Sequence, residues 1–522
     1  MSSENNYYNF ENDFDKLSNK YNKNKLNISF NRVAFIFFTF FLILIIFSLK
    51  AFYLTGKKLP KNNIIGPKKD IRSNILDRND NILAKTIITR NIGINPNLVI
   101  DKKTLLLKLK ILFPQKNYDL IEKKLNGNKF FYFAEELNPE NYEKLILIGD
   151  KSLIPENRVT RVYPQKNLFS HIIGQIDNEN NGVSGIEKSY DKILKDGSYN
   201  LKLSVDLNLQ YLIHAELIKF QNIFNSIGSA AILMNSENGE ILSLLSLPDY
   251  DLNKRQLLND KNLINRATKG VYELGSVFKS FTIAAGLNYG LISPEYTFEN
   301  IERKMKCGRR VISEYDENLP KDLSVEDILV YSSNIGSVKI GQLVGQEKLK
   351  IFLKQIGVLN QLNFDIKEIG KPIPFTWRDC KLKTVSYGHG ITTTPIQLAK
   401  GYAILANGGY EIRPTLIKKD IYNSKKKRIL KKNVSSQINN IFRKVVTHGT
   451  ASLSDVEGYE VGGKTGTAQI VENGVYTNKK INTFASVFPS SDPKYVLVIL
   501  LEDTKLSKDY VYKYRNKPGS FK

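Results

Sequence analysis

Ser276 and Lys279 form a pair of residues that could carry out acyl transfer. They stand three positions apart at the start of a stretch of good helix formers, and in a helix that spacing puts both side chains on one face. A serine hydroxyl is a weak nucleophile that needs an adjacent base. A free lysine, with a pKa of about 10.4, is protonated at neutral pH, so a lysine base requires burial or a second cation. Gly275 ends the preceding loop, and the N–H groups of the first helical turn favour developing negative charge.

Two later motifs supply polar groups that could surround a reacting carbonyl. Ser332-Ser333-Asn334 offers a hydroxyl and an amide two residues apart. Lys464-Thr465-Gly466-Thr467 combines a cation and two hydroxyls, which suit a carboxylate, with a glycine beside a strand predicted over residues 468–471. Glycine at a strand lets a substrate backbone approach closely.

Each motif alone is weak, because similar patterns recur elsewhere in the chain. In order and together, however, the three match the set found in penicillin-binding proteins and class A β-lactamases, with Ser332-Ser333-Asn334 in the place of Ser-Asp-Asn. The sequence therefore predicts a serine acyltransferase with Ser276 as nucleophile. The chance repeats are Ser-x-x-Lys at Ser189, Ser424 and Ser491 and Ser-x-Asn at Ser198 and Ser236.

An uncharged stretch from Val33 to Leu49, bracketed by Arg32 and Lys50, is dominated by Phe, Ile and Leu. As a helix it covers roughly 25 Å, and the apolar residues after Lys50 extend it to the length of a ~30 Å hydrocarbon core. No small-residue cleavage site follows, so a removed signal peptide is disfavoured. We expect a cytoplasmic tail at 1–32 and a transmembrane helix at 33–54. Because lysines flank the stretch on both sides, the positive-inside rule does not decide its orientation.

The region 55–204 is predicted to be a mixed domain without a catalytic cluster. It combines an extended piece at 74–83, lysine-rich amphipathic helices at 102–112 and 117–125, and polar loops. At 522 residues the chain is too long for one compact core, so a second folded unit is expected after it.

The region 205–522 is predicted to be an α+β domain with an antiparallel sheet packed by helices. It begins with two apolar runs, 229–234 and 240–247, joined by the hairpin signal Asn238-Gly239. A largely helical block from about 265 to 450 follows, and strands return at 483–488 and 495–501. Strands first and last with helices between them predict this architecture.

Composition excludes several other functions. The net charge of +24 comes from lysines spread along the chain without interleaved aromatics, which argues against nucleic-acid binding. The basic run at 425–428 predicts a solvated hairpin, with attraction to an anionic membrane surface as the alternative. Four scattered histidines show no metal-ligand spacing, and we predict neither a metal nor a cofactor. Cys307 and Cys380 could form one disulfide, and the sequence does not decide whether they do.

Over roughly residues 60 to 503 the chain resembles the class B penicillin-binding proteins. The approach to the nucleophile, Tyr272-Glu273-Leu274-Gly275-Ser276, is similar to the family's. Motifs of the family's pedestal domain separate this resemblance from a β-lactamase, which would need neither a pedestal nor an anchor. They stand at 72–79, 82–84, 161–164 and 182–187.

The resemblance implies a D,D-transpeptidase that cross-links peptidoglycan stem peptides and is acylated by β-lactams. Ser276 would attack the D-Ala-D-Ala carbonyl, with Lys279 as base and Ser332 as proton relay. Asn334 would hold the substrate amide and Lys279, and Lys464 would supply positive potential. Thr465 and Thr467 would bind the substrate carboxylate beside Gly466, and the backbone N–H groups of Ser276 and Thr467 would form the oxyanion hole.

Within the family, the motif 386–391 with Thr394-Pro395-Ile396-Gln397, together with the short pedestal, resembles the division-specific branch more than the elongation branch. That branch implies a bacterial cytoplasmic membrane location, an extracytoplasmic catalytic domain, and a membrane glycosyltransferase and other division proteins as partners. His389 and Trp377 are predicted to be structural.

The chain departs from the family at three places. Ser73 stands where Gly is usual and Leu274 where Pro is common. Family members usually continue into a C-terminal helix that packs on the sheet, and no such helix is recognisable after 513–518, which would weaken the catalytic domain.

An elongation-type enzyme and an idle scaffold that regulates a glycosyltransferase are the alternative functions. A penicillin-sensing or penicillin-hydrolysing receptor ranks last, because the tail has no recognisable domain.

Overall fold

The computed structural model describes residues 30–56, 71–254, 263–419, 427–472, 474–505, 507–508 and 510. It forms two compact units, Met1–Lys69 and Asp70–Lys522. In the first, helix α2 (Phe30–Gly56) is long and apolar enough to cross a membrane, with a mean hydropathy of 2.6 over Val33–Lys50 and none of that window buried. The anchor predicted at 33–54 is therefore helical. The expectations for residues 425–426 and for the segment after 513 lie outside the described residues.

The second unit begins with a pedestal built on one long strand, β2 (Ile82–Ile94), which pairs antiparallel with β3 (Phe131–Leu137) and β4 (Leu153–Val162). Helices α3 (Lys102–Leu112) and α4 (Tyr118–Leu125) confirm the two predicted amphipathic helices, and their leucines pack with Ile92 and Ile94 of β2. Each helix starts at a side-chain cap, Asp101 for α3 and Asn117 for α4. The piece predicted as extended at 74–83 is interrupted by a turn between β1 (Ile75–Leu76) and β2. A further helix, α5 (Pro139–Ile146), lies between β3 and β4.

The base of the pedestal is held together by backbone pairing and by buried charges. Strand β1 pairs in parallel with β5 (Leu201–Lys202), which ends just before residue 205. The guanidinium groups of Arg72 and Arg161 bind the carboxylate of Glu187, and all three side chains are almost completely buried. Three pedestal motifs recognised in the sequence therefore meet at one ion cluster. Short helices α6 (Ser170–Ile173), α7 (Gly185–Ser189) and α8 (Asp191–Asp196) surround it.

The domain that follows the pedestal is built on a five-stranded antiparallel sheet, as predicted. Its strand order is β12-β13-β14-β6-β7, so strands from the two ends of the domain meet where β14 pairs with β6. Strands β6 and β7 are buried almost throughout because the sheet is covered on both faces. The bounds are β6 (Gly228–Asn235), β7 (Ile241–Leu247), β12 (Gly462–Glu472), β13 (Val475–Phe488) and β14 (Tyr495–Glu502).

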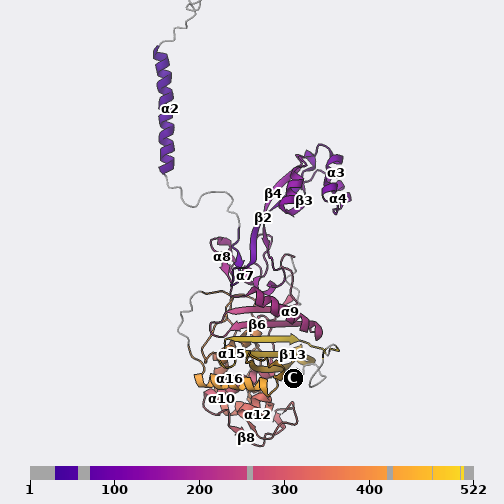
Figure 1. The fold of residues 1–522 in the computed structure, drawn as a ribbon, viewed down its shortest axis with the longest axis vertical. Coiled ribbons are helices and arrows are strands. Elements are labelled where there is room, and N and C mark those ends of the chain that lie inside the picture. Colours follow the sequence, from indigo (N-terminus) through magenta and orange to yellow (C-terminus); the bar gives the residue numbers. More distant parts are fainter. Residues whose placement is uncertain are drawn as a thin grey trace, which may run out of the picture. The chain divides into compact units, whose positions relative to one another are not determined.

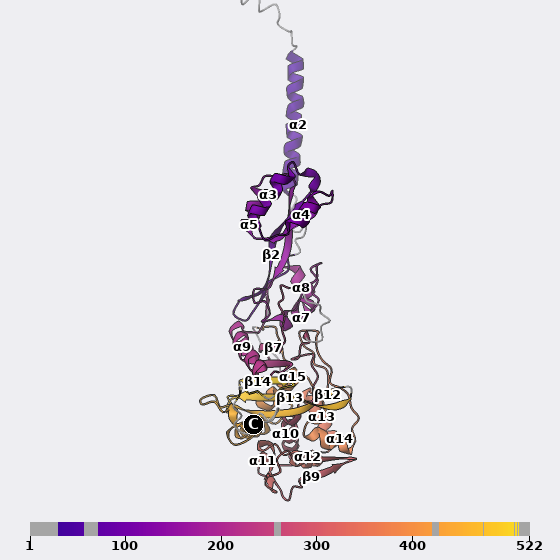
Figure 2. The ribbon, with the colours of Figure 1, turned by 90° about the vertical axis from the view of Figure 1, so that its right-hand side faces the viewer.

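Helices cover the two faces of this sheet unequally. Helix α9 (Leu207–Ile223) packs on one face, and the helical block with α10 (Lys279–Asn288) lies on the other (Figures 1 and 2). Helix α10 is buried from Lys279 to Leu287 because α12, α13 and α16 surround it. The remaining helices are α11 (Val325–Val330), α12 (Asn334–Val344), α13 (Gln346–Ile356), α14 (Asp379–Ser386), α15 (Pro395–Ala406) and α16 (Lys432–Thr447).

Two small sheets interrupt the block predicted as helical. Strands β9 (Lys304–Cys307) and β10 (Arg310–Ser313) form a hairpin, and β8 (Thr297–Phe298) pairs with β11 (Leu323–Ser324). A disulfide joins Cys307 to Cys380, which settles the pairing that the sequence left open. Trp377 packs against Phe375 and the core, as expected for a structural residue.

Candidate active site

The nucleophile lies in a tight turn before helix α10. Gly275–Phe278 form a 3-10 turn and the α-helix begins at Lys279, so the predicted first helical turn is a 3-10 turn instead. Gly275 has φ +64°, and a Cβ there would lie 2.5 Å from the carbonyl oxygen of Thr467 on β12. Only glycine fits this conformation and this contact. The turn therefore brings half-buried Ser276 against the edge strand of the sheet.

Lys279 is fully buried and connects two of the predicted motifs. Its Nζ donates to the carbonyl oxygen of Ser332 (2.6 Å), to Ser332 Oγ (3.1 Å) and to Asn334 Oδ1 (2.8 Å). Ser332 has φ +63°, an unfavourable conformation for serine, and its carbonyl and hydroxyl both reach Lys279. The structure thus brings Lys279, Ser332 and Asn334 together.

Asn334 is oriented by the end of strand β10 and the residue after it. Its Nδ2 donates to the carbonyl oxygen of Ser313 (2.9 Å), so its Oδ1 faces Lys279. The buried carboxylate of Glu314 accepts hydrogen bonds from Ser333 Oγ (2.6 Å) and from the backbone N–H groups of Asn334 (2.7 Å) and Ile335 (2.9 Å). A carboxylate at these orphan N–H groups stabilises the N-terminus of α12. Glu314 was not predicted as a site residue, because no local motif marks it.

The third motif lies within strand β12, which begins at Gly462 and not after the motif as predicted. Thr465 Oγ1 and Thr450 Oγ1 lie 3.1 Å apart, and Thr467 Oγ1 donates to Asn482 Oδ1 (3.3 Å). Lys464 is fully buried, and its Nζ donates to the carbonyl oxygen of Thr465 (3.0 Å) and to Thr450 Oγ1 (3.5 Å). Its Nζ therefore lies beneath the hydroxyls of Thr450 and Thr465.

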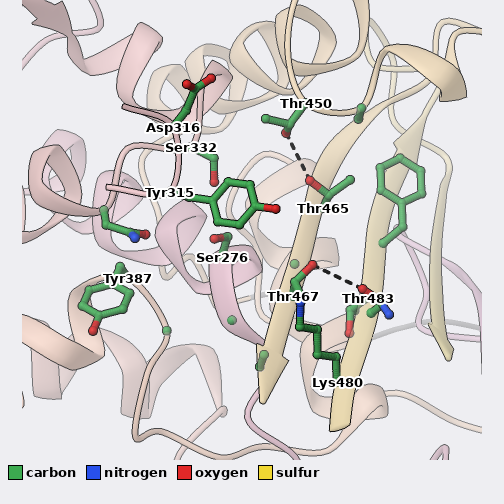
Figure 3. Close-up of a pocket in the computed structure, with 18 of the residues that line it drawn as sticks. Ser276, Tyr315, Asp316, Ser332, Tyr387, Thr450, Thr465, Thr467, Lys480 and Thr483 are labelled. Carbon is green, nitrogen blue, oxygen red and sulfur yellow. Dashed lines mark hydrogen bonds between the residues drawn. The ribbon is translucent and has the colours of Figure 1, made fainter. Parts of the chain in front are cut away.

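A pocket of about 460 Å³ lies between the three motifs. Figure 3 shows Ser276 with Tyr315 and Ser332 on one side and the strand carrying Thr465 and Thr467 on the other. Lys279 and Lys464 are not among the residues that line it, since both lie beneath its surface. The predicted residues that line it are Ser276, Ser332, Asn334, Thr465, Gly466 and Thr467. Lining residues that were not predicted include Tyr315, Asp316, Tyr387, Thr450, Lys480 and Asn482.

One wall of the pocket is a stack of rings around a buried carboxylate. The His389 ring lies between the rings of Tyr387 and Tyr476, at centroid distances of 5.9 and 4.8 Å. Glu273, three residues before the nucleophile, accepts hydrogen bonds from Tyr476 OH (3.0 Å) and Gly390 N–H (2.9 Å), and lies 3.6 Å from His389 Nδ1. His389 thus has a packing role, as predicted, but it also lines the pocket.

The electrostatics of this wall favour neutral rings. Burial lowers the pKa of His389, against the opposing effect of Glu273, and the nearby cations Arg310 and Lys381 lower it further. Burial and Glu273 raise the pKa of Tyr387 to about 12 and also raise that of Tyr476. Near neutral pH the wall therefore presents a neutral imidazole and neutral phenols.

A buried lysine behind a serine, with hydroxyls and an amide around one pocket, defines a serine acyltransferase site on an α+β domain. Two family models match the chain. The Penicillin binding protein transpeptidase domain covers residues 229–518, and the Penicillin-binding Protein dimerisation domain covers residues 67–206. No group of metal-ligating side chains occurs among the described residues.

Curated relatives and solved structures agree with these matches. The chain is 30 % identical over 451 residues to the probable peptidoglycan D,D-transpeptidase FtsI of Caulobacter vibrioides, covering 83 % of this chain and 76 % of the relative. It is 28 % identical to a peptidoglycan D,D-transpeptidase FtsI of Buchnera aphidicola, covering 94 % of each. Penicillin binding protein 3 of Mycobacterium tuberculosis, complexed with aztreonam, shares the fold with a TM-score of 0.66 at 21 % identity, over 83 % of this chain and 90 % of that one. The chain belongs to the class B penicillin-binding proteins.

Proposed function

We propose that this protein is a peptidoglycan D,D-transpeptidase that cross-links stem peptides during septal wall synthesis. The observation that carries the proposal is that the buried Lys279 donates hydrogen bonds to Ser332 and Asn334. Lys279 directly follows the 3-10 turn that holds Ser276. The relatives' names support both the reaction and the division-specific branch over the elongation branch.

In the proposed acylation step, Ser276 Oγ attacks the carbonyl carbon of the penultimate D-Ala while Lys279, in its neutral form, takes the hydroxyl proton. Ser332, 3.1 Å from Lys279 Nζ, passes a proton to the nitrogen of the departing D-Ala. The C–N bond breaks and the acyl group stays on Ser276. The amine of a second stem peptide then attacks this ester and gives a proton to Lys279, which passes it to Ser276 Oγ as the ester C–O bond breaks.

Substrate binding follows from the edge strand. Gly275 lies against the backbone of Thr467, so the N–H groups of Ser276 and Thr467 would stabilise the oxyanion, an effect worth about 3 kcal/mol per donor. Thr465 and Thr467 would hold the terminal carboxylate of the substrate. The buried ammonium of Lys464 would add positive potential from beneath Thr450 and Thr465.

For the whole chain, we propose a single-pass protein of the bacterial cytoplasmic membrane with residues 1–32 inside. The pedestal (55–204) and the transpeptidase domain (205–522) would lie outside, where an oxidising compartment suits the Cys307–Cys380 disulfide. The length and apolar composition of helix α2 support the proposal of a membrane anchor. A membrane glycosyltransferase and other division proteins are the proposed partners.

Labelling the full-length protein in detergent with a fluorescent penicillin tests the proposal. Wild type should form a long-lived adduct and release D-Ala from a pentapeptide donor, and Ser276→Ala should do neither. Ser189→Ala is the matched control, because Ser189 begins a second Ser-x-x-Lys sequence outside the pocket and should label like wild type. Equal labelling of Ser276→Ala would remove Ser276 from the mechanism, and an unlabelled wild type would favour the idle scaffold. Rapid loss of the adduct would favour a penicillin-hydrolysing receptor.

A further inference from the structure

The Cys307–Cys380 disulfide joins two segments that are distant in the sequence and that each lead to residues lining the pocket. Cys307 ends strand β9 and Cys380 lies in the first turn of α14, 73 residues later, with their Cα atoms 5.1 Å apart. Cys307 is buried and Cys380 is partly exposed. The bond therefore fixes the β9–β10 hairpin against α14.

The hairpin leads directly to the groups that orient the base. Strand β10 ends at Ser313, whose carbonyl sets the amide of Asn334 so that its oxygen faces Lys279. Glu314, the next residue, binds the start of α12 through three hydrogen bonds. A displacement of the hairpin would thus move Asn334 relative to Lys279.

Helix α14 is tied to the nucleophile's side of the pocket. The carbonyl oxygen of Ser386, its last residue, accepts a hydrogen bond from Thr282 Oγ1 of α10 (2.9 Å). Beyond the helix, Gly388 packs so closely on the nucleophile turn that a Cβ would lie 2.0 Å from the carbonyl oxygen of Gly275. The disulfide therefore connects the Asn334-orienting hairpin to the elements that carry Ser276 and Lys279.

We propose that this disulfide is a positioning element of the active site, holding Asn334 in register with Lys279 and Ser276. The hairpin is a two-stranded sheet of its own, and isolated hairpins are marginally stable. Acyl transfer is sensitive to such placement, since a shift of about 1 Å costs on the order of 100-fold in rate. The inference rests on the proposed transpeptidase function of the same site.

Reduction of the folded, full-length protein tests the role directly. Dithiothreitol transfers two electrons and two protons, so the protein S–S bond becomes two thiols and the reagent becomes its cyclic disulfide. We expect reduced wild type and the Cys307→Ser/Cys380→Ser variant to be acylated by a fluorescent penicillin about tenfold more slowly at saturation, with the initial binding constant little changed. Dithiothreitol should leave the double-serine variant unaffected, which controls for effects of the reagent elsewhere.

A double-mutant cycle separates positioning from general stabilisation. If the disulfide acts through Asn334, its removal should slow the residual acylation of Asn334→Ala little further, whereas additive losses would overturn the proposal. Thermal unfolding of each form is followed in parallel, and a loss of acylation that only tracks the unfolded fraction would also overturn it. If the double-serine variant does not fold, reduced wild type, with its thiols counted, decides the question. An oxidised wild type that forms no adduct refutes the proposed function, but unchanged acylation after reduction refutes only this inference.

Discussion

Two buried cationic clusters in this protein, one at the base of the pedestal and one in the active site, are bound in different ways. At the pedestal base, Arg72 and Arg161 share the carboxylate of Glu187, with contacts of 2.8 Å from each arginine. In the active site, the acceptors of Lys279 Nζ include a carbonyl, a hydroxyl and an amide oxygen, and these three are neutral. Lys464 likewise donates to a carbonyl and a hydroxyl.

This difference indicates that the buried charges of the pedestal stabilise the fold, whereas the buried lysines of the active site serve the reaction. Opposite charges in direct contact lock each other in the ionised state, and removing one partner leaves an uncompensated buried ion. Neutral acceptors orient an ammonium without fixing its proton, because the same oxygens also tolerate a neutral amine that donates two hydrogen bonds. Mutation should therefore cost stability at the pedestal base and cost rate in the active site.

Lys279→Ala should produce the largest effect. Removing the general base is expected to slow penicillin acylation by roughly 10²–10⁴-fold while the domain stays folded. Fluorescent-penicillin kinetics measure the rate, and circular dichroism checks the fold. Lys192→Ala, from the chance Ser-x-x-Lys sequence, is the control and should react like wild type. Acylation of Lys279→Ala within tenfold of wild type would contradict its role as base.

Glu187→Gln should show the opposite pattern. It leaves Arg72 and Arg161 buried without their shared carboxylate, so the free energy of unfolding should fall by about 3–5 kcal/mol. Acylation per folded molecule should stay unchanged, because the cluster does not line the pocket. Urea titration measures the first quantity and adduct yield the second. If Glu187→Gln were as stable as wild type but acylated slowly, the proposed difference between a structural and a catalytic cluster would be wrong.

His389→Gln should change how stability responds to pH. Its pKa in the folded protein lies below the ordinary value of 6.5, chiefly because of burial, with Glu273 opposing and Arg310 and Lys381 assisting. As pH falls below 6.5 the unfolded chain takes up a proton before the folded one does, so His389 destabilises the fold increasingly until its own pKa is passed.

The stability advantage of wild type over His389→Gln should therefore shrink between pH 7 and pH 5. Solvent screening of a side chain that is 33 % exposed limits the slope to at most about 1 kcal/mol per pH unit. Thermal unfolding across this range measures it. A constant difference for His389→Gln would contradict the lowered pKa.

Much of the fold and the chemical motifs could be predicted from local patterns. Helix α3 and the β6–β7 hairpin follow from periodicity and turn residues, and both were confirmed. Strand β12 was placed too late, because its first residues are held by pairing with β13 and not by their own propensity.

The supporting groups of the site could not be predicted in this way. Glu314 binds Asn334 across 20 residues, and Tyr476 reaches Glu273 across 203. Such contacts depend on how the domain folds and leave no spacing in the sequence. The same holds for the pairing of Cys307 with Cys380, which the fold alone decides.

Asp191→Asn provides the smallest and most specific test of the comparison. Asp191 contacts Arg72 at 2.7 Å from the edge of the pedestal cluster, where its side chain remains 27 % exposed. Desolvation raises its pKa, but hydrogen bonds from Arg72, Gly182 and Lys195 outweigh it, so the pKa lies below the ordinary 3.8. A lowered carboxyl pKa contributes stability that is present above pH 3.8 and is lost as pH falls through the folded-state pKa.

At neutral pH the Asp191→Asn loss should be about 1 kcal/mol, because solvent screens the pair, and it should diminish in acid. Urea titrations at pH 7 and pH 3 measure both values. In the Glu187→Gln background, Asp191→Asn should lower the free energy of unfolding by a larger amount. Of the two carboxylates that contact Arg72 in this cluster, Asp191 is then the one that remains. If Asp191→Asn lowered the free energy of unfolding at neutral pH as much as Glu187→Gln does, the energy of an ion pair in this cluster would not depend on its burial. The contrast with the active site would then rest only on the charge of the binding partners.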